Sequence, residues 1–288
     1  MKKILFACDG EHFSEGAFEF VRRLNEDEPL MLTGVFLANA EYSSLWSYAN
    51  GLSGPLFVPV VEQSEPDALA RSIQHFEQLC QHQGIEYRIH RDHFDFALSE
   101  LKRETRFADL LVIGSQCYYE NLKGVPNPYL QDTIHHAECP VVIVPENFLY
   151  PESVILTYDG TASSVAAIKQ FMYLFPEWRT KRSVLVVAGV EDENAAIPHQ
   201  IEIEEWASRH FSDLTIVPLS IDPGKYFTTW IENEKGALLV CGTPAKGSWF
   251  SFFRKNFLEE ILQDQAKHEF FEQELEGNQL PIFIGGYL

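Results

Sequence analysis

The chain of 288 residues consists of two copies of one sequence pattern, and this duplication limits the available folds more than any other feature. Three stretches of the first copy recur in the same order in the second: residues 4–10 as 154–160, residues 108–115 as 236–243, and residues 139–144 as 280–285. The first match continues without a gap to Leu24 and Leu174. We therefore predict two copies of one folding unit, residues 1–147 and residues 151–288.

Each copy alternates short apolar runs with stretches of helical period, which is the pattern of βαβ units and a parallel sheet. The apolar runs are continuous, as is typical of strands buried on both faces. The predicted strands are residues 3–8, 30–37, 85–90, 110–114 and 141–144 in the first copy, and 154–158, 183–189, 214–219, 237–241 and 281–284 in the second. Five strands in each copy, joined by right-handed crossovers, predict a doubly wound α/β fold.

The predicted helices lie between these strands, at residues 14–24, 65–83, 94–107 and 129–136 in the first copy, and 163–175, 198–211, 226–234 and 250–275 in the second. The copies differ most at residues 39–63, an insert of the first copy that is rich in tyrosine, tryptophan, serine, glycine and proline. A loop of this length usually covers a ligand or forms a contact surface. Its aromatic side chains favour packing against the other copy, with a lid over a ligand as the alternative.

The charge of the chain excludes two classes of partner. Its 42 acidic and 22 basic side chains give a formal net charge of −20, which repels nucleic-acid phosphates and anionic lipid headgroups. We therefore expect neither nucleic-acid nor membrane binding. No apolar stretch approaches the roughly 18 residues that cross a bilayer. The N-terminal apolar run ends at Asp9 without a signal-peptide cleavage site. A cytoplasmic location is the expectation.

The cysteines and histidines form no motif of a metal site or a catalytic centre. The five cysteines contain no Cys-x-x-Cys pair, so we expect reduced, structural thiols. The histidines gather in the first copy without the His-Glu-x-x-His spacing of zinc enzymes, so no metal site is expected. The sequence has neither a Gly-x-Ser-x-Gly nucleophile motif nor a Gly-x-x-x-x-Gly-Lys-[Ser/Thr] phosphate loop. We therefore predict no catalytic residues.

A ligand of a doubly wound sheet binds beyond the carboxyl ends of the strands, where the strand order reverses. The loops after the first and fourth strands of each copy flank this crevice. They hold the candidate binding residues Asp9, Gly114 and Ser115 in the first copy, and Asp159, Gly242, Thr243, Gly247 and Ser248 in the second. A carboxylate accepts hydrogen bonds from a ribose or an adenine amine, and the N–H groups of a Gly/Ser/Thr loop bind phosphate. The alternative for Asp9 and Asp159 is a turn that caps the next helix.

These motifs resemble the universal stress protein family over almost the whole chain. Both copies carry a strand, then Asp-Gly-x-x-x-Ser-x-x-Ala, then a fourth strand ending in Gly-[Ser/Thr], and finally [Cys/Leu]-Pro-[Val/Ile]-x-[Ile/Val]. The resemblance implies flavodoxin-like (adenine nucleotide alpha hydrolase-like) domains with strand order 3-2-1-4-5, paired through their fifth strands. It also implies a role in stress endurance rather than a defined reaction.

The phosphate loop of the ATP-binding members of this family is incomplete in both copies. That loop reads Gly, two residues, Gly, nine residues, then Gly-[Ser/Thr]. The first copy begins at Gly114 but has Cys117 at the second glycine. The second begins at Gly242, and only an inserted residue brings Gly247 to the second place. Because a Cβ atom blocks the approach of backbone to phosphate, both losses weaken ATP binding. The second copy is the better candidate, because Lys246, Ser248 and Arg254 offer an anion other contacts, unless the two basic side chains are simply solvated.

The sequence therefore predicts a tandem universal stress protein without enzymatic activity. It would act by binding a small ligand, such as ATP or another adenine nucleotide, and by contacting a protein partner. The first alternative is a nucleotide-dependent enzyme of the related ATP-pyrophosphatase-like fold, although the Ser-Gly-Gly-x-Asp-Ser loop of that class is missing after the first strand. The second alternative is a scaffold without a ligand. Pairing of the copies within one chain leaves both a monomer and a homodimer open.

Overall fold

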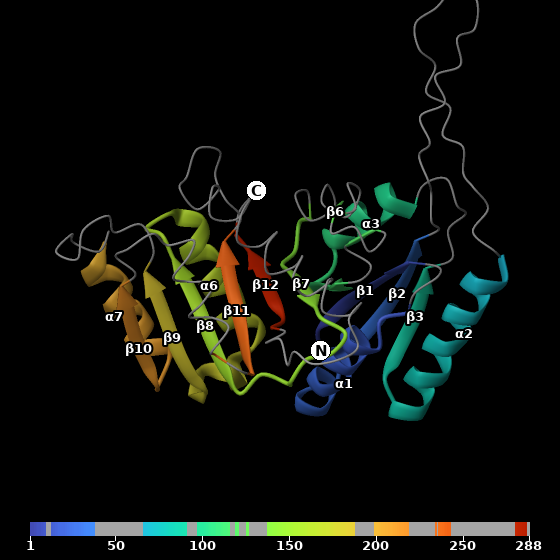
Figure 1. Ribbon diagram of the computed structural model, residues 1–288, viewed down its shortest axis with the longest axis horizontal. Helices are drawn as coiled ribbons and strands as arrows, with labels where there is room; N and C mark the ends of the chain where they lie inside the picture. Colours follow the sequence, from blue (N-terminus) through green and yellow to red (C-terminus); the bar gives the residue numbers. More distant parts are fainter. Residues whose placement is uncertain are drawn as a thin grey trace, which may run out of the picture.

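One continuous sheet forms the centre of the protein in its computed structural model (Figure 1). The structure describes residues 1–9, 13–37, 66–90, 97–115, 119–120, 125–126, 137–187, 199–218, 234, 236–242 and 280–286. Its strands are β1 (Lys3–Asp9), β2 (Met31–Leu37), β3 (Glu86–His90), β4 (Leu110–Gly114), β7 (Val141–Val144), β8 (Ser153–Tyr158), β9 (Arg182–Val187), β10 (Leu214–Pro218), β11 (Ala237–Gly242) and β12 (Ile282–Gly285). Among the described residues, these ten strands share the order β10-β9-β8-β11-β12-β7-β4-β1-β2-β3.

This order confirms the predicted fold. Within each half, the sheet reads third, second, first, fourth and fifth strand, and all neighbours within a half are parallel. The two fifth strands meet in the middle, where β7 and β12 pair antiparallel with Val142 opposite Phe283. The halves therefore share one sheet, and each fifth-strand edge is covered by the other half.

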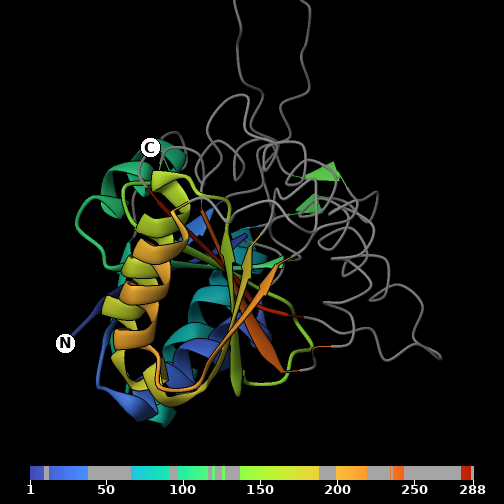
Figure 2. The ribbon, with the colours of Figure 1, turned by 90° about the vertical axis from the view of Figure 1, so that its left-hand side faces the viewer.

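The helices are α1 (Glu15–Asp27), α2 (Pro66–Gln83), α3 (Ala97–Thr105), α6 (Ala162–Leu174) and α7 (Gln200–His210), with a 3-10 turn η1 (Pro176–Thr180). Figure 2 shows α6 and α7 side by side on one face of the sheet. The buried side chains of α1, α2, α6 and α7 share one core with alternate strand residues such as Phe6 and Leu156. Leu101 of α3 belongs to a second core with Leu5 and Ile155 on the opposite face. The fold is thus doubly wound, as predicted.

Several predicted elements differ from the structure or lie outside its described residues. Helix α3 ends at Thr105 rather than at residue 107, because the Thr105 hydroxyl donates 2.6 Å to the Lys102 carbonyl and accepts from the Glu138 N–H. Strand β3 is half-exposed because it lies at the sheet edge, so burial on both faces was the wrong expectation there. Unpredicted elements are η1 and a short ladder of β5 (Tyr119–Glu120) with β6 (Val125–Pro126). The insert at 39–63 and the helices predicted at 129–136, 226–234 and 250–275 lie outside the described residues.

No helix in the described part of the chain is long and apolar enough to span a bilayer. The described residues also contain no group of histidine, cysteine and acidic side chains that could hold a metal ion. Four cysteines are described, and none of them forms a disulfide: Cys8, Cys80, Cys139 and Cys241.

Burial of two thiols predicts a loss of stability at alkaline pH. Removal from water raises the pKa of Cys80, and likewise that of Cys139, from 9.0 to about 12, with smaller contributions from Glu77 and Asp109. Between these values the unfolded chain releases protons that the folded protein keeps, so stability falls as the pH rises from about 9 towards 12. At pH 10 each thiol removes about 1.4 kcal/mol from the free energy of unfolding.

Urea unfolding at pH 8 and pH 10 measures this loss. In Cys80→Ala, the difference between the two pH values is expected to shrink by about 1.4 kcal/mol, whatever the packing cost of the substitution. An unchanged difference in this variant would show that the Cys80 thiol titrates equally in both states.

Candidate functional site

The predicted binding glycines lie where strand ends approach helix N-termini. A Cβ atom at Gly114, the last residue of β4, would lie 2.5 Å from the Ser14 side chain, which caps α1. At Gly242, the last residue of β11, it would lie 2.8 Å from the Ser164 backbone nitrogen in the first turn of α6. Both glycines are therefore required by packing, independently of any ligand.

Asp159 forms the turn that starts α6. Its Oδ1 atom accepts from the Thr161 N–H at 3.0 Å and from the Thr161 hydroxyl at 2.6 Å. Gly160 between them has a φ of +78°, in the left-handed region that favours glycine. Thr161 then accepts from the Ser164 N–H as the helix cap. The geometry of Asp159 thus matches the alternative prediction, a turn that leads into the next helix. One of its carboxylate oxygens holds this turn.

The other predicted site residues are only partly described. Ser115 directly follows β4 and is buried. The backbone of Asp9 ends β1, but its side chain lies outside the described part of the structure. Residues Thr243, Gly247 and Ser248 lie outside it as well, together with Lys246 and Arg254. Of the predicted residues, the structure therefore locates Gly114, Ser115, Asp159 and Gly242.

Sequence reasoning missed Glu146, which binds the N-terminus of α1. Its carboxylate accepts from the Ser14 hydroxyl at 2.8 Å and from the N–H groups of Glu15 at 2.8 Å and Gly16 at 3.2 Å. A helix N-terminus attracts anions in this way because its first N–H groups lack acceptors within the helix. The matching position of the second copy is Tyr287, and this difference between the copies was the available signal.

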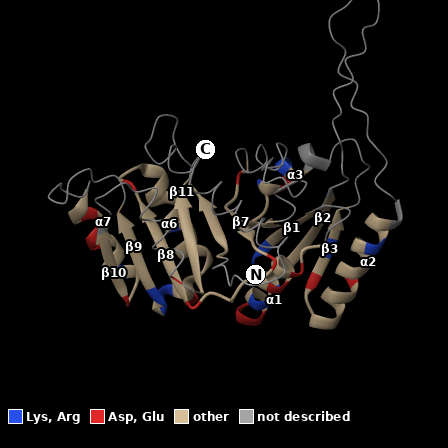
Figure 3. Ribbon diagram, in the orientation of Figure 1, with Lys and Arg blue, Asp and Glu red and all other residues tan. Residues whose placement is uncertain are grey.

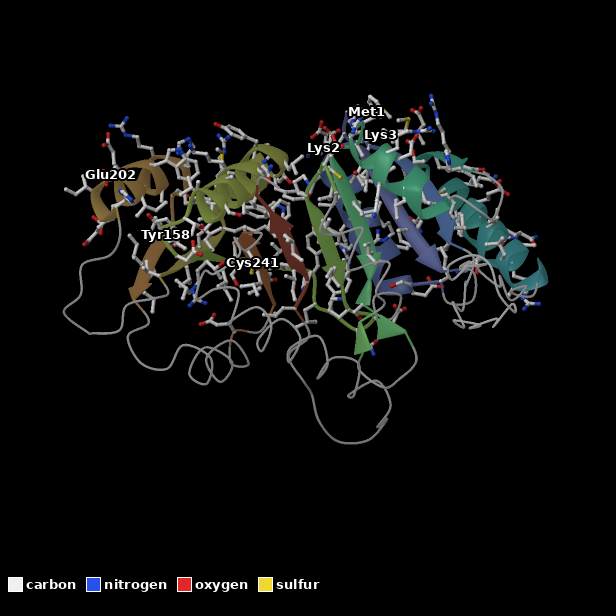
Figure 4. The ribbon with its side chains drawn as sticks, turned by 90° about the horizontal axis from the view of Figure 1, so that it is seen from above. Met1, Lys2, Lys3, Tyr158, Glu202 and Cys241 are labelled. Atoms are coloured by element: carbon white, nitrogen blue, oxygen red, sulfur yellow. The ribbon has the colours of Figure 1, made fainter. Side chains whose placement is uncertain are left out.

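A cavity of about 720 Å³ lies in the second half, between α6 and α7. Its lining comes from the end of β8, the Gly160–Thr161 turn and the facing sides of both helices: Tyr158, Gly160, Thr161, Ala162, Val165, Ala166, Lys169, Gln170, Tyr173, His199, Glu202, Ile203 and Trp206. Figure 4 shows Tyr158 at the end of β8 and Glu202 on α7. Neither Asp159 nor Gly242 lines the cavity, so it is distinct from the predicted nucleotide site.

The charged groups of this cavity come from both helices. Lys169 on α6 places its ammonium 5.8 Å from the centre of the Trp206 ring. Figure 3 marks acidic residues of α7 in red, and Glu202 of this helix lines the cavity. Burial raises the pKa of Tyr158, and the negative charges of Asp159 and Glu202 raise it further. The Tyr158 phenol therefore stays protonated at neutral pH and forms a polar group beside apolar walls.

A direct contact bridges the corresponding helices of the first half. Between α1 and α2, the Nε2 atom of His75 lies 2.6 Å from the Glu15 carboxylate. The Phe13 ring packs edge-on against the His75 ring, with centroids 4.8 Å apart. In the repeat, Glu15 corresponds to Val165, which lines the open cavity of the second half.

No protein-family profile and no curated protein matches this sequence. Solved structures do match it over 99% of its length. A universal stress protein from Archaeoglobus fulgidus has a TM-score of 0.59 at 12% identity, with 97% of that chain covered. A proposed universal stress protein from Pseudomonas aeruginosa has a TM-score of 0.53 at 11% identity and 94% coverage. The cytoplasmic domain of a prokaryotic cation chloride cotransporter has a TM-score of 0.50 at 11% identity and 95% coverage. The protein thus has the fold of the universal stress proteins, with both domains in one chain.

Proposed function

We propose that this protein is a non-enzymatic, stress-response protein of the universal stress type that binds an adenine nucleotide through its second half. The first half then serves as a structural partner of the second. The observation that carries this division is the position of Glu146 at the N-terminus of α1. Support for the general class comes from the shared fold and from the repeated Asp-Gly and Gly-[Ser/Thr] motifs.

The Glu146 carboxylate disfavours an anionic ligand in the first half. It already satisfies two backbone N–H groups and one hydroxyl at the point where α1 meets the end of β4. A phosphate at this place would lose these donors and would face a like charge at short range. The second half has an uncharged tyrosine, Tyr287, at the matching position. The proposed nucleotide therefore has its phosphates beside Gly242 and its ribose or base near Asp159.

The surroundings of Asp159 also support the proposal that the site binds a nucleotide without catalysing a reaction. Among the described residues, Asp159 is the acidic residue that directly follows β8, and its carboxylate accepts two hydrogen bonds from Thr161. A group that holds a turn is a poor general base, because a proton transfer would compete with those bonds. We therefore propose binding without turnover of ATP.

Nucleotide binding to the full chain tests this proposal with a matched pair of variants. Asp159→Asn keeps an oxygen for the turn but removes the charge, and is expected to weaken ATP binding roughly tenfold in calorimetric titration. Asp9→Asn is the equivalent change in the first half and is expected to leave the affinity unchanged. Equal losses in both variants, or an ATP hydrolysis that disappears in Asp159→Asn, would contradict the proposal.

Mass spectrometry of the denatured, freshly purified protein provides an independent check. We expect an adenine nucleotide at no more than one equivalent per chain. Two equivalents would contradict the assignment of a structural role to the first half.

A further inference from the structure

We infer that the cavity between α6 and α7 is a second binding site, for a small aromatic molecule that carries one negative charge. The cavity adjoins the proposed nucleotide site at the Gly160–Thr161 turn, but it extends away from that site between α6 and α7, and neither Asp159 nor Gly242 lines it. Its volume of about 720 Å³ lies in the usual range for small-molecule sites, which are mostly apolar with a few polar groups.

The first copy of the repeat provides a comparison for this cavity. It has the same strands and helices but bridges the corresponding helices with the contact between His75 and Glu15 and with the Phe13 ring. The fold therefore does not require an opening between these two helices. In the second copy, Val165 stands at the position of Glu15, so this contact cannot form, and Val165 lines the cavity from α6 together with Ala162 and Ala166. An opening that only one of two copies retains points to a use specific to that copy.

The walls favour an aromatic ligand. Trp206 of α7 and Tyr173 of α6 line the cavity, and Tyr173 is 67% exposed although it is a large aromatic residue. Tyr158 is 1% exposed and contributes its ring at the strand end. Flat ligands stack on such rings, and each aromatic pair adds stabilisation beyond the area that it buries.

The electrostatics favour an anion. Lys169 is the single cationic side chain of the lining and forms no ion pair with any described residue; its ammonium lies over Trp206. The first turn of α6, which also lines the cavity, contains no acidic residue, although Asp159 accepts the Thr161 N–H. The first turn of α7, in contrast, contains Glu202, which balances the positive end of that helix. The lining that comes from α6 therefore contains one cation and no acidic residue.

Glu202 then selects among aromatic anions. It is exposed, so water weakens its repulsion of a ligand anion held at Lys169. Its carboxylate offers an acceptor on the α7 side, opposite the cation on α6. A ligand with an N–H or O–H donor on its ring system and an acid group at the other end matches both charges.

A matched pair of fluorescent probes tests the charge and the place together. 8-Anilinonaphthalene-1-sulfonate is an aromatic anion whose N–H group lies beside its own sulfonate, so it probes the cation at Lys169 without donating to Glu202. N-phenyl-1-naphthylamine is the same molecule without the sulfonate. The folded full chain is expected to bind the sulfonate with one site per chain. Lys169→Met keeps the apolar stem and is expected to weaken sulfonate binding about tenfold, and naphthylamine binding less than about twofold. Lys102→Met on α3, on the opposite face of the sheet, is the control and should change neither.

Two further variants complete the test. Glu202→Gln is expected to strengthen sulfonate binding about twofold, because it removes a like charge, whereas a site for cations would respond in the opposite sense. Val165→Trp fills the cavity and is expected to abolish binding of both probes, with circular dichroism as the measure of its folding.

Equal affinity of Lys169→Met and the wild type for the sulfonate would overturn the proposal. Because Lys169→Met should leave ATP binding unchanged, failure of the nucleotide proposal and failure of this one are separable.

Discussion

Replacing Gly16 with alanine is expected to destabilise the protein by about 3 kcal/mol, although alanine normally stabilises a helix interior by about 1 kcal/mol relative to glycine. The Cβ atom would lie 2.3 Å from the Pro145 carbonyl oxygen and 2.7 Å from the Glu146 Cα atom. These are backbone atoms, so neither can rotate away as a side chain would. The chain after β7 would have to move, and Glu146 would move with it.

The second copy again supplies the control. Residue 166, which matches Gly16 in the repeat, is alanine and is buried on α6. Ala166→Gly is therefore expected to cost only about 1 kcal/mol, the difference in helix propensity. Urea unfolding of both variants measures the contrast. Similar small costs at both positions would show that residues 145–146 do not pack against α1 in solution.

Because Gly16 also donates to Glu146, the same variant tests the proposed division of labour between the halves. Displacing Glu146 would free the N–H groups of Glu15 and Gly16 for another anion. Glu146→Gln weakens the hydrogen bonds to the same two N–H groups, because a neutral amide oxygen accepts more weakly than a carboxylate. It does so without introducing a steric clash. If the first half is a closed copy of a binding unit, these variants should bind phosphate there more readily than the wild type.

The duplication made most of the fold predictable from the sequence. The strands followed from continuous apolar runs, whereas their order 3-2-1-4-5 was implied by the resemblance to the universal stress protein family. The ends of β4 and β7 were predicted to the residue. The edge exposure of β3 was missed, although Glu86, Arg88 and His90 alternate there with Tyr87 and Ile89, unlike the continuous apolar run of the central strand β4. Helix α3 ended early because its last turn depends on a hydrogen bond between Thr105 and Glu138, 33 residues apart.

The site was less predictable, because its features depend on which residues meet across the sheet. Gly114 and Gly242 were selected for a phosphate loop, yet the structure shows that each also packs against a helix N-terminus. Glu146 is unremarkable in sequence, and its role depends on β7 lying next to β4 and delivering a carboxylate to α1. The cavity was missed because it depends on how α6 and α7, two helices separated in sequence, face each other; of its lining, Val165 replaces the Glu15 that contacts His75 in the first copy.

Removal of the Trp178 side chain is expected to lower the free energy of unfolding of the whole protein by about 4 kcal/mol. Trp178 is 1% exposed, and its ring lies 5.7 Å from both Phe171 and Phe175 of the second half. It also lies 5.9 Å from Tyr150 in the connection between the halves. The Lys181 ammonium sits 4.2 Å above the Trp178 ring and donates to the Pro151 carbonyl in the same connection. Trp178→Ala would leave a cavity beneath all of these groups.

Trp178→Phe is the matched control and is expected to cost only about 1 kcal/mol. It keeps a ring in the cluster, and it removes an indole N–H that finds no acceptor among the described residues. A cost equal to that of Trp178→Ala would mean that the indole nitrogen, rather than the packing of the ring, matters most at this site.

How far the destabilisation in Trp178→Ala extends into the first half is more informative than its size. Tyr150 packs on Phe20 of α1 at 6.2 Å as well as on Trp178, so the loss should reach the first half. The sheet is also continuous through the antiparallel pair of β7 and β12. Hydrogen exchange followed by mass spectrometry should therefore show peptides of β1 and β9 losing the same protection in Trp178→Ala. If only β9 exchanged faster, the halves would unfold as independent domains, and the shared sheet would not make them one cooperative unit.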